Sequence, residues 1–502
     1  MRFREPWKWF SFGVAALIGL ALRLFFALKF PAGTSDGLIY EALARNWRAH
    51  GIYGLDLAGR IMPVDIRMPG YPAFLAAVSY LLGRGETRLM LAQVIVDLST
   101  CALAAILAGM LAQERSRRRV RLAAFWLAAL CPFLANYSAT VLTEVPATFF
   151  TVAALIAFAN GCAGRDNLSL HSLGLGLSNA DSVARRESFS LFRNSWLVGG
   201  LAVGTGTLVR PETPLLLIAL FALLLWRWKG FDGWLKFFRA AILIGVGFVL
   251  PLIPWTVRNA VSLHEFQPLA PRYATLPGEV APRGYYSWTN TWLTRYSQIN
   301  PVIWMLDEDQ LNLADFPDAA FDSPGERERV AALVADYNRN CCSVTPAWDA
   351  QFAELARERT ARHPLRTYIS VPFARAFTLW FTPRVELLPY SGELWPLRKS
   401  FQVDRVDFSV TVLLGALGIA YVGLAMGGAM WIFSHRQAIS ASQLWAAGLL
   451  ALFCLIRTAY LTRVETPEPR YVLECFPAIF ALAAMLWSGS AVGSQRSSTG
   501  SG

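Results

Sequence analysis

Long apolar stretches alternate with short polar ones along most of this chain. A helix needs about 20 residues to cross a hydrocarbon core about 30 Å thick, and ten stretches approach that length. They cover residues 12–30, 88–112, 122–138, 143–161, 195–210, 212–228, 237–257, 409–433, 442–462 and 470–488. The pattern predicts an all-α polytopic membrane protein with about ten transmembrane helices, the first of them uncleaved.

Two further apolar segments are too short to span a bilayer. Residues 70–83 could lie in the interface or re-enter the membrane. Residues 368–381 are aromatic and contain Arg375, which favours an interfacial helix. Neither segment enters the count of spanning helices.

Composition and charge agree with a membrane protein. Of the 502 residues 16% are charged, against about 25% in soluble proteins. This largely excludes an ordinary soluble enzyme. Much of the net charge of +11 lies in three short loops between apolar stretches. These loops contain Arg115, Arg117, Arg118, Arg119 and Arg121; Arg165, Arg185, Arg186 and Arg193; and Arg227, Lys229, Lys236 and Arg239. Because basic loops stay in the cytoplasm, both termini are predicted to be cytoplasmic.

Two longer polar segments then face outward, namely 31–67 and a stretch from Arg258 to about Arg366. The predicted organisation is a transmembrane catalytic module (1–257), an extracytoplasmic segment (258–408), C-terminal transmembrane helices (409–488) and a disordered Ser/Gly-rich tail (489–502). The long polar segment is rich in Trp, Tyr, Pro and Asp, which suits a small lid domain.

Charged residues gather at the outward ends of the predicted helices. They are Asp36, Arg67, Glu144, Arg210, Glu212, Arg258, Glu468 and Arg470. Charged groups at membrane depth are costly and tend to mark function. The loop charges that set the orientation are different residues, so the shared side is partly independent support for a site there.

Arginines and carboxylates on one rim suit the transfer of a sugar from a polyprenyl phosphate. Arginine binds phosphate bidentately and is always charged. Since phosphate is a good leaving group, stabilisation of its charge can replace a general acid. A carboxylate need only deprotonate the acceptor, and a one-step substitution inverts the anomeric carbon.

The sequence resembles the GT-C superfamily of integral-membrane glycosyltransferases, in particular aminoarabinose transferases, lipopolysaccharide-core sugar transferases and protein O-mannosyltransferases. The resemblance is strongest over residues 10–260 and weaker in the last helix. Its motifs are Asp36 to Tyr40 with Ala42-Leu43-Ala44 and Gly51-Ile52-Tyr53, Arg67-Met68-Pro69-Gly70-Tyr71-Pro72, Leu142-Thr143-Glu144, Pro254-Trp255 with Arg258-Asn259, and Pro469-Arg470-Tyr471.

The resemblance implies a role for each matching position. Asp36 matches a catalytic acid of the first loop, and Glu144 matches a second acidic position. Arg67 matches a residue that contacts the lipid phosphate. Many relatives carry two adjacent acids where this chain has Asp36 followed by Gly37. We also expect Arg210, Arg258 and Arg470 to bind the donor phosphate, and Tyr40, Tyr71, Glu212 and Glu468 to support the site.

Other interpretations of these residues stay open at this stage. Asp36 could cap a helix beginning at Gly37, and Glu468 could pair only with Arg470. The five histidines form no ligand motif, so no metal or other cofactor is expected, although Asp36 and Glu144 could share a divalent cation.

The predicted function is glycosyl transfer to a glycan, lipid or protein acceptor of the cell envelope, at the plasma (inner) membrane. Nucleic acid is not an expected partner. One alternative is a transporter or flippase of a lipid-linked sugar, which would place polar residues near the bilayer midplane. Another is an inactive assembly scaffold.

Overall fold

The computed structural model describes residues 7–164, 194–276, 278–340 and 342–489, and these are mostly helical. Residues 490–502 of the tail predicted as disordered (489–502) lie outside them, and so do the basic residues Arg165, Arg185, Arg186 and Arg193. Within the described ranges the strands are β1 (Gly54–Leu57) and β2 (Arg60–Pro63), which form one antiparallel hairpin.

Seven helices are long and apolar enough to cross a membrane, and each matches a predicted stretch. They are α1 (Trp7–Lys29), α4 (Glu86–Leu111), α7 (Glu144–Cys162), α10 (Gly230–Ser262), α16 (Arg405–Ser434), α17 (Ala441–Leu461) and a composite helix of η7 (Pro469–Cys475), α18 (Phe476–Ala483) and η8 (Ala484–Ser488). The prediction of a helical, multi-pass membrane protein is confirmed.

The other three predicted stretches form shorter helices. They are α5 (Glu114–Ala129) followed by α6 (Pro132–Tyr137), α8 (Ser195–Val209) and α9 (Leu215–Arg227). Pro132 begins α6, so the apolar run 122–138 is divided into two helices. Proline lacks the N–H that a continuous helix would need there.

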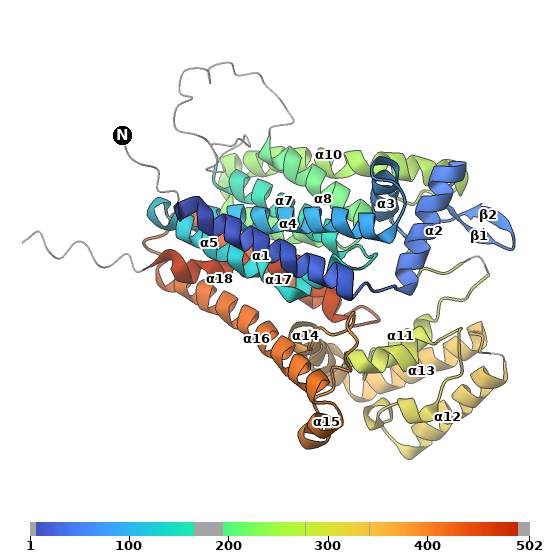
Figure 1. Cartoon of the computed structure of the whole chain (residues 1–502). Helices are drawn as coiled ribbons and strands as arrows, with labels where there is room; N and C mark the ends of the chain where they lie inside the picture. Colours follow the sequence, from blue (N-terminus) through green and yellow to red (C-terminus); the bar gives the residue numbers. More distant parts are fainter. Residues whose placement is uncertain (1–6, 165–193, 277, 341, 490–502) are drawn as a thin grey trace, which may run out of the picture.

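The long helices run side by side in one bundle, and α16 crosses it obliquely (Figure 1). Helices α8 and α10 approach each other closely. A Cβ atom on Gly200 or Gly204 would lie 2.3 Å from the carbonyl oxygen of Ile244 or Phe248, respectively. Small residues spaced four apart let two helix backbones approach this closely, as is common between membrane helices.

One buried ion pair joins three helices inside the bundle. Arg23 of α1 donates to Asp97 of α4 over 2.6 Å, and both side chains are at most 1% exposed. The same guanidinium donates to the carbonyl oxygens of Ala128 and Ala129 at the end of α5. Paired in this way, two charges can lie within apolar helices.

The segment after α1 covers one end of the bundle, here called the α2 end. Helix α2 (Ser35–His50) lies across that end, with the hairpin and α3 (Gly70–Leu81) beside it (Figure 1). Thr34 caps α2 by accepting from the N–H of Gly37, and Gly51 ends it with a φ of 70°. Because Thr34 is the cap and the helix begins at Ser35, the interpretation of Asp36 as a cap is wrong.

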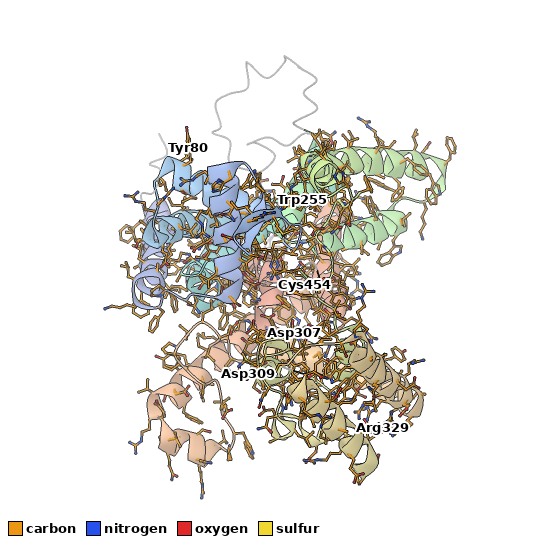
Figure 2. All side chains as sticks on the ribbon, turned by 90° about the vertical axis from the view of Figure 1, so that its right-hand side faces the viewer. Tyr80, Trp255, Asp307, Asp309, Arg329 and Cys454 are labelled. Carbon is orange, nitrogen blue, oxygen red and sulfur yellow. The ribbon has the colours of Figure 1, made fainter. Side chains whose placement is uncertain are left out.

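The long polar segment folds into a helical insert below the α2 end. Figure 2 looks onto that end, with Tyr80 of α3 at the top and Arg329 of the insert at the bottom. The insert contains α11 (Arg283–Thr289), η2 (Tyr296–Gln298), η3 (Asn300–Trp304), η4 (Leu313–Asp315), η5 (Asp318–Ala320), α12 (Pro324–Arg339) and α13 (Pro346–Arg362). Its core is aromatic, with Tyr285, Trp288, Trp348 and Phe352 packed together.

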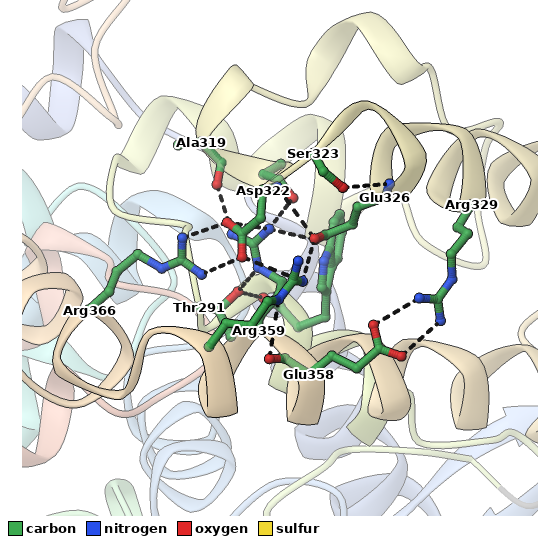
Figure 3. Close-up of polar contacts among 12 residues, drawn as sticks. Thr291, Ala319, Asp322, Ser323, Glu326, Arg329, Glu358, Arg359 and Arg366 are labelled. Atoms are coloured by element: carbon green, nitrogen blue, oxygen red, sulfur yellow. Dashed lines mark hydrogen bonds and ion pairs between the residues drawn. The ribbon is translucent and has the colours of Figure 1, made fainter.

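A buried ionic network stabilises the insert beside this core. Arg359 is fully buried and lies within 3.1 Å of Asp322 and 2.5 Å of Glu326 (Figure 3). Arg366 also pairs with the carboxylate of Asp322. The chain then returns to the bundle through η6 (Arg366–Ser370), α14 (Val371–Phe381) and α15 (Leu397–Val403).

Candidate active site

Asp36 lies in the first turn of α2 and pairs with two arginines. Its Oδ1 is 2.7 Å from Nη2 of Arg67, and its Oδ2 is 3.3 Å from Nη2 of Arg470. Burial alone would raise the pKa of Asp36, but the two guanidinium groups hold it below the usual value. With 29% of its side chain exposed, Asp36 remains accessible from outside the bundle.

Glu144 begins α7 and is 2% exposed. Its Oε1 accepts a hydrogen bond of 3.0 Å from Arg210, which ends α8. Its Oε2 is buried and has no hydrogen-bond partner among the described residues. A buried carboxylate oxygen left without a donor is costly, so this atom is available to a ligand or a water molecule.

Arg470 bridges the two acids. Its Nη1 lies 3.7 Å from Glu144, while its Nη2 contacts Asp36 and its Nε donates to Glu468 over 2.6 Å. Glu468 therefore pairs with Arg470, but not with Arg470 alone, since Tyr471 also donates to it. We call Asp36, Arg67, Glu144, Arg210 and Arg470 the arginine–carboxylate cluster.

The predicted tyrosines lie directly behind this cluster. Tyr40 and Tyr71 meet edge to face with ring centroids 5.1 Å apart. The Tyr71 hydroxyl donates to Gln93, whose amide donates in turn to the carbonyl oxygens of Ser138 and Thr140. This chain of bonds holds the segment that leads into Glu144.

Arg258 is directed elsewhere. Its guanidinium donates to the carbonyl oxygens of Tyr53 and Val64 and lies over the ring of Trp255. These contacts tie the end of α10 to the hairpin of the first polar segment. Of the four arginines predicted to bind phosphate, the structure brings three together and places Arg258 against the hairpin.

The cluster continues inward through the predicted Glu212 and through two residues that the sequence analysis missed. Nε of Arg210 lies 3.7 Å from Glu212 and 3.6 Å from Glu474. Glu474 also accepts from Arg457 and from Thr151, and both Glu474 and Arg457 are at most 1% exposed. Arg457 and Glu474 are charged residues within predicted apolar stretches, and this signal could have identified both of them.

Comparison with known proteins concerns the fold. No protein-family model matches this sequence, and no curated protein matches it. The oligosaccharyltransferase of Archaeoglobus fulgidus, tethered with an acceptor peptide containing the NVT sequon, has a TM-score of 0.48 and 13% identity over 97% of this chain and 49% of its own. ArnT from Cupriavidus metallidurans, bound to undecaprenyl phosphate, has a TM-score of 0.39 and 15% identity over 92% of this chain and 78% of its own.

The chain is structurally similar to GT-C glycosyltransferases. The predicted resemblance is thereby confirmed for the fold alone, over nearly the whole chain. The chain spans about half the length of the oligosaccharyltransferase.

The arginine–carboxylate cluster offers guanidinium groups to an anion and carboxylates to a proton. The described residues contain no group of three or more His, Cys, Asp or Glu side chains that could hold a metal ion. A divalent cation shared by Asp36 and Glu144 would have to replace Arg470, which lies within 3.7 Å of both.

Proposed function

We propose that this protein is an inverting glycosyltransferase that moves a sugar from a polyprenyl phosphate to an acceptor hydroxyl. The observation that supports it most is the position of Arg470. Its guanidinium contacts both Asp36 and Glu144 at the α2 end, where the helices end. A polyprenyl chain would stay in the bilayer and present its phosphate at this level.

The donor phosphate is bound by Arg67, Arg210 and Arg470. All three guanidinium groups already pair with carboxylates. Two oxygens of a phosphate can accept from a guanidinium fork in the same bidentate manner as a carboxylate. It would take the place of Asp36 on Arg67 and Arg470, and this exchange would free the Asp36 carboxylate.

The freed carboxylate then acts as the general base. The acceptor oxygen attacks the anomeric carbon while its proton passes to Asp36. The bond between that carbon and the phosphate oxygen breaks, and the phosphate leaves with the electron pair, stabilised by the arginines. Glu144 holds Arg210 in place and presents its free Oε2 to the sugar.

A flippase is the second candidate, favoured by the charges inside the bundle. Arg457 and Glu474 extend the cluster into the helices, and Arg23 and Asp97 form another intramembrane pair. All four pair with each other and bind neighbouring polar groups, and Nη1 of Arg457 is left buried without a hydrogen-bond partner among the described residues. Polar groups that bind one another suit a structural role better than a polar path for a moving substrate.

The test uses purified protein in detergent, a panel of radiolabelled polyprenyl-phosphate sugars and a membrane extract as acceptor. Transfer or slow release of the sugar is measured for wild type, Asp36→Asn and Glu144→Gln. Asp56→Asn is the matched control, because Asp56 is exposed on the hairpin of the same polar segment.

Label moved by wild type and Asp56→Asn, and by neither other variant, would support the proposal. Donor binding without any release would favour the flippase. Full activity in Asp36→Asn would exclude Asp36 as the base, and tolerance of alanine at all the cluster charges would favour a scaffold.

A further inference from the structure

A further carboxylate lies near the arginine–carboxylate cluster, on the segment that returns from the insert. Glu386 lies in the turn after α14, and its Oε1 accepts a hydrogen bond of 2.7 Å from the hydroxyl of Tyr137. Tyr137 is 2% exposed at the end of α6, seven positions before Glu144. Two elements more than 240 positions apart therefore meet at this bond.

The turn that carries Glu386 is held firmly. Arg384, 3% exposed, donates to the carbonyl oxygen of Leu379 over 2.9 Å. Its guanidinium lies 5.0 Å from the ring centroid of Phe133 and 5.3 Å from that of Phe476. Both rings belong to the bundle, so the position of Glu386 is set by packing.

Glu386 differs from Asp36 and Glu144 in its partners. Its Oε2 is buried and has no hydrogen-bond partner among the described residues. None of the arginines that the structure describes lies within ion-pair distance of the Glu386 carboxylate. Burial raises the pKa of Glu386, and the charges of Arg384 and Arg470 offset that rise only in part. A buried acceptor left in this state calls for an explanation, and a ligand that donates a hydrogen bond supplies one.

The surroundings of Glu386 indicate the direction from which such a ligand comes. The charge of Arg470 lowers the pKa of Glu386. Burial raises the pKa of Tyr296 of the insert, and so do the charges of Glu386 and Glu468. The charge of Glu144 also reaches the hydroxyl of Tyr137. Glu386 therefore lies between the cluster and the insert. A hydroxyl or ammonium group can donate to the free carboxylate oxygen, whereas an ionised phosphate has only acceptors to offer.

We propose that Glu386, oriented by Tyr137, forms an acceptor subsite that binds a hydroxyl or ammonium group of the acceptor. The free Oε2 accepts a hydrogen bond from that group and aligns the attacking oxygen with the donor. Glu386 takes no proton in the reaction, since the proton of the attacking oxygen passes to Asp36. This inference rests on the proposed glycosyl transfer.

The first test separates the acceptor from the donor. Glu386→Gln keeps the shape of the side chain and places an amide donor where the acceptor group must be bound. We expect transfer to a membrane extract to fall about tenfold or more, with hydrolysis of the donor by water and the KM for the donor unchanged. Tyr137→Phe should give a smaller loss of the same kind. Glu393→Gln is the control, because Glu393 is exposed in the same segment.

The second test does not depend on turnover. Dicyclohexylcarbodiimide modifies buried protonated carboxyl groups, and mass spectrometry measures its rate at Glu386. The membrane extract should slow this modification, and undecaprenyl phosphate alone should not. If wild type neither transfers nor hydrolyses any donor, glycosyl transfer fails, while protection by the extract still supports the subsite.

Three results would overturn the subsite. One is full transfer by Glu386→Gln. Another is an equal loss of transfer and donor hydrolysis with an unchanged melting temperature, which would assign Glu386 to the donor. The third is protection by undecaprenyl phosphate alone or absence of protection by the extract.

Discussion

At the scale of single residues, Asp36 and the donor phosphate compete for the same two guanidinium groups. Asp36 is paired with Arg67 and Arg470 and has a lowered pKa, so in this state it is a weak base. Binding of phosphate to these arginines would release it, and its pKa would then rise. Binding of the donor would therefore activate the base that deprotonates the acceptor.

This competition predicts opposite effects of Asp36→Asn on catalysis and binding. Transfer should fall by about 10²–10⁴, the usual contribution of a general base. Affinity for undecaprenyl phosphate should rise several-fold, because a neutral asparagine binds the two arginines less strongly than aspartate does and the phosphate displaces it more easily. Titration calorimetry measures the Kd, with Asp56→Asn as control. A weaker Kd in Asp36→Asn would mean that Asp36 holds the arginines in place rather than competing for them.

At the scale of elements, the packing of α8 against α10 depends on the absence of side chains. A methyl group on Gly200 would approach the carbonyl oxygen of Ile244 to 2.3 Å, whereas one on Gly245 of α10 would meet no atom within 4 Å. Gly200→Ala should destabilise the protein by about 1–3 kcal/mol through overpacking. Gly245→Ala should be neutral or slightly stabilising, since alanine favours helix over glycine. Thermal unfolding in detergent compares the two, and equal melting temperatures would contradict the close packing of these helices.

Helix α14 is the element for which the sequence predicts an interfacial position. Its buried Arg375 donates to the carbonyl oxygens of Leu293 and Val464, which fixes the helix against the bundle and the insert. An exposed stripe spaced four residues apart runs from the residue before η6 into α14. It consists of Leu365, Ile369, Phe373 and Phe377, which are 60–77% exposed. Such a face suits the boundary of headgroups and acyl chains.

We expect a bimane label at Phe373→Cys to be quenched by brominated lipids. The same label at Glu354→Cys, exposed on α13, should not be quenched. Both are read by fluorescence in proteoliposomes of a variant without other cysteines. Equal quenching at the two positions would argue against an interfacial α14.

At the scale of the whole molecule, the bundle divides the chain between two sides. The cluster, the hairpin and the insert lie at the α2 end, while the start of α5 lies at the other (Figure 1). The five arginines predicted to form a basic loop, Arg115 to Arg121, belong to the first turns of this helix. We propose that the α2 end is extracytoplasmic. An impermeant maleimide applied to intact cells should label Glu354→Cys, and should label Glu114→Cys only after permeabilisation, since both positions are exposed. The reverse labelling would invert the orientation.

The stability of the insert should depend on pH through its ionic network. Burial alone would raise the pKa of Asp322, but Arg366 and Arg359 hold it below the usual value. The unfolded chain therefore binds this proton more readily, so the stabilisation is complete above the ordinary pKa of about 4 and is lost as pH falls toward the lowered value. Tryptophan fluorescence of the aromatic core should report unfolding in that range. The matched variant Asp322→Asn should flatten the profile, and an unchanged profile would contradict the assignment.

Much of the architecture could be predicted because each membrane helix is determined by its own stretch of sequence. Ten apolar runs indicated the helices, and seven of them are long enough to span a membrane. Asp36, Arg67, Glu144, Arg210 and Arg470 were found by their place at the ends of these runs, and the structure brings all five together. Burial in lipid constrains each segment by itself, so length and apolarity suffice.

Pairing between distant segments was decided only by the tertiary structure. The sequence alone could not show that Arg470 reaches Asp36 across 434 positions, or that Arg258 serves the hairpin instead. Nor could it place Glu386 opposite Tyr137. A side chain selects its partner only after helix packing has fixed distances and excluded water, and that information is spread over the whole bundle.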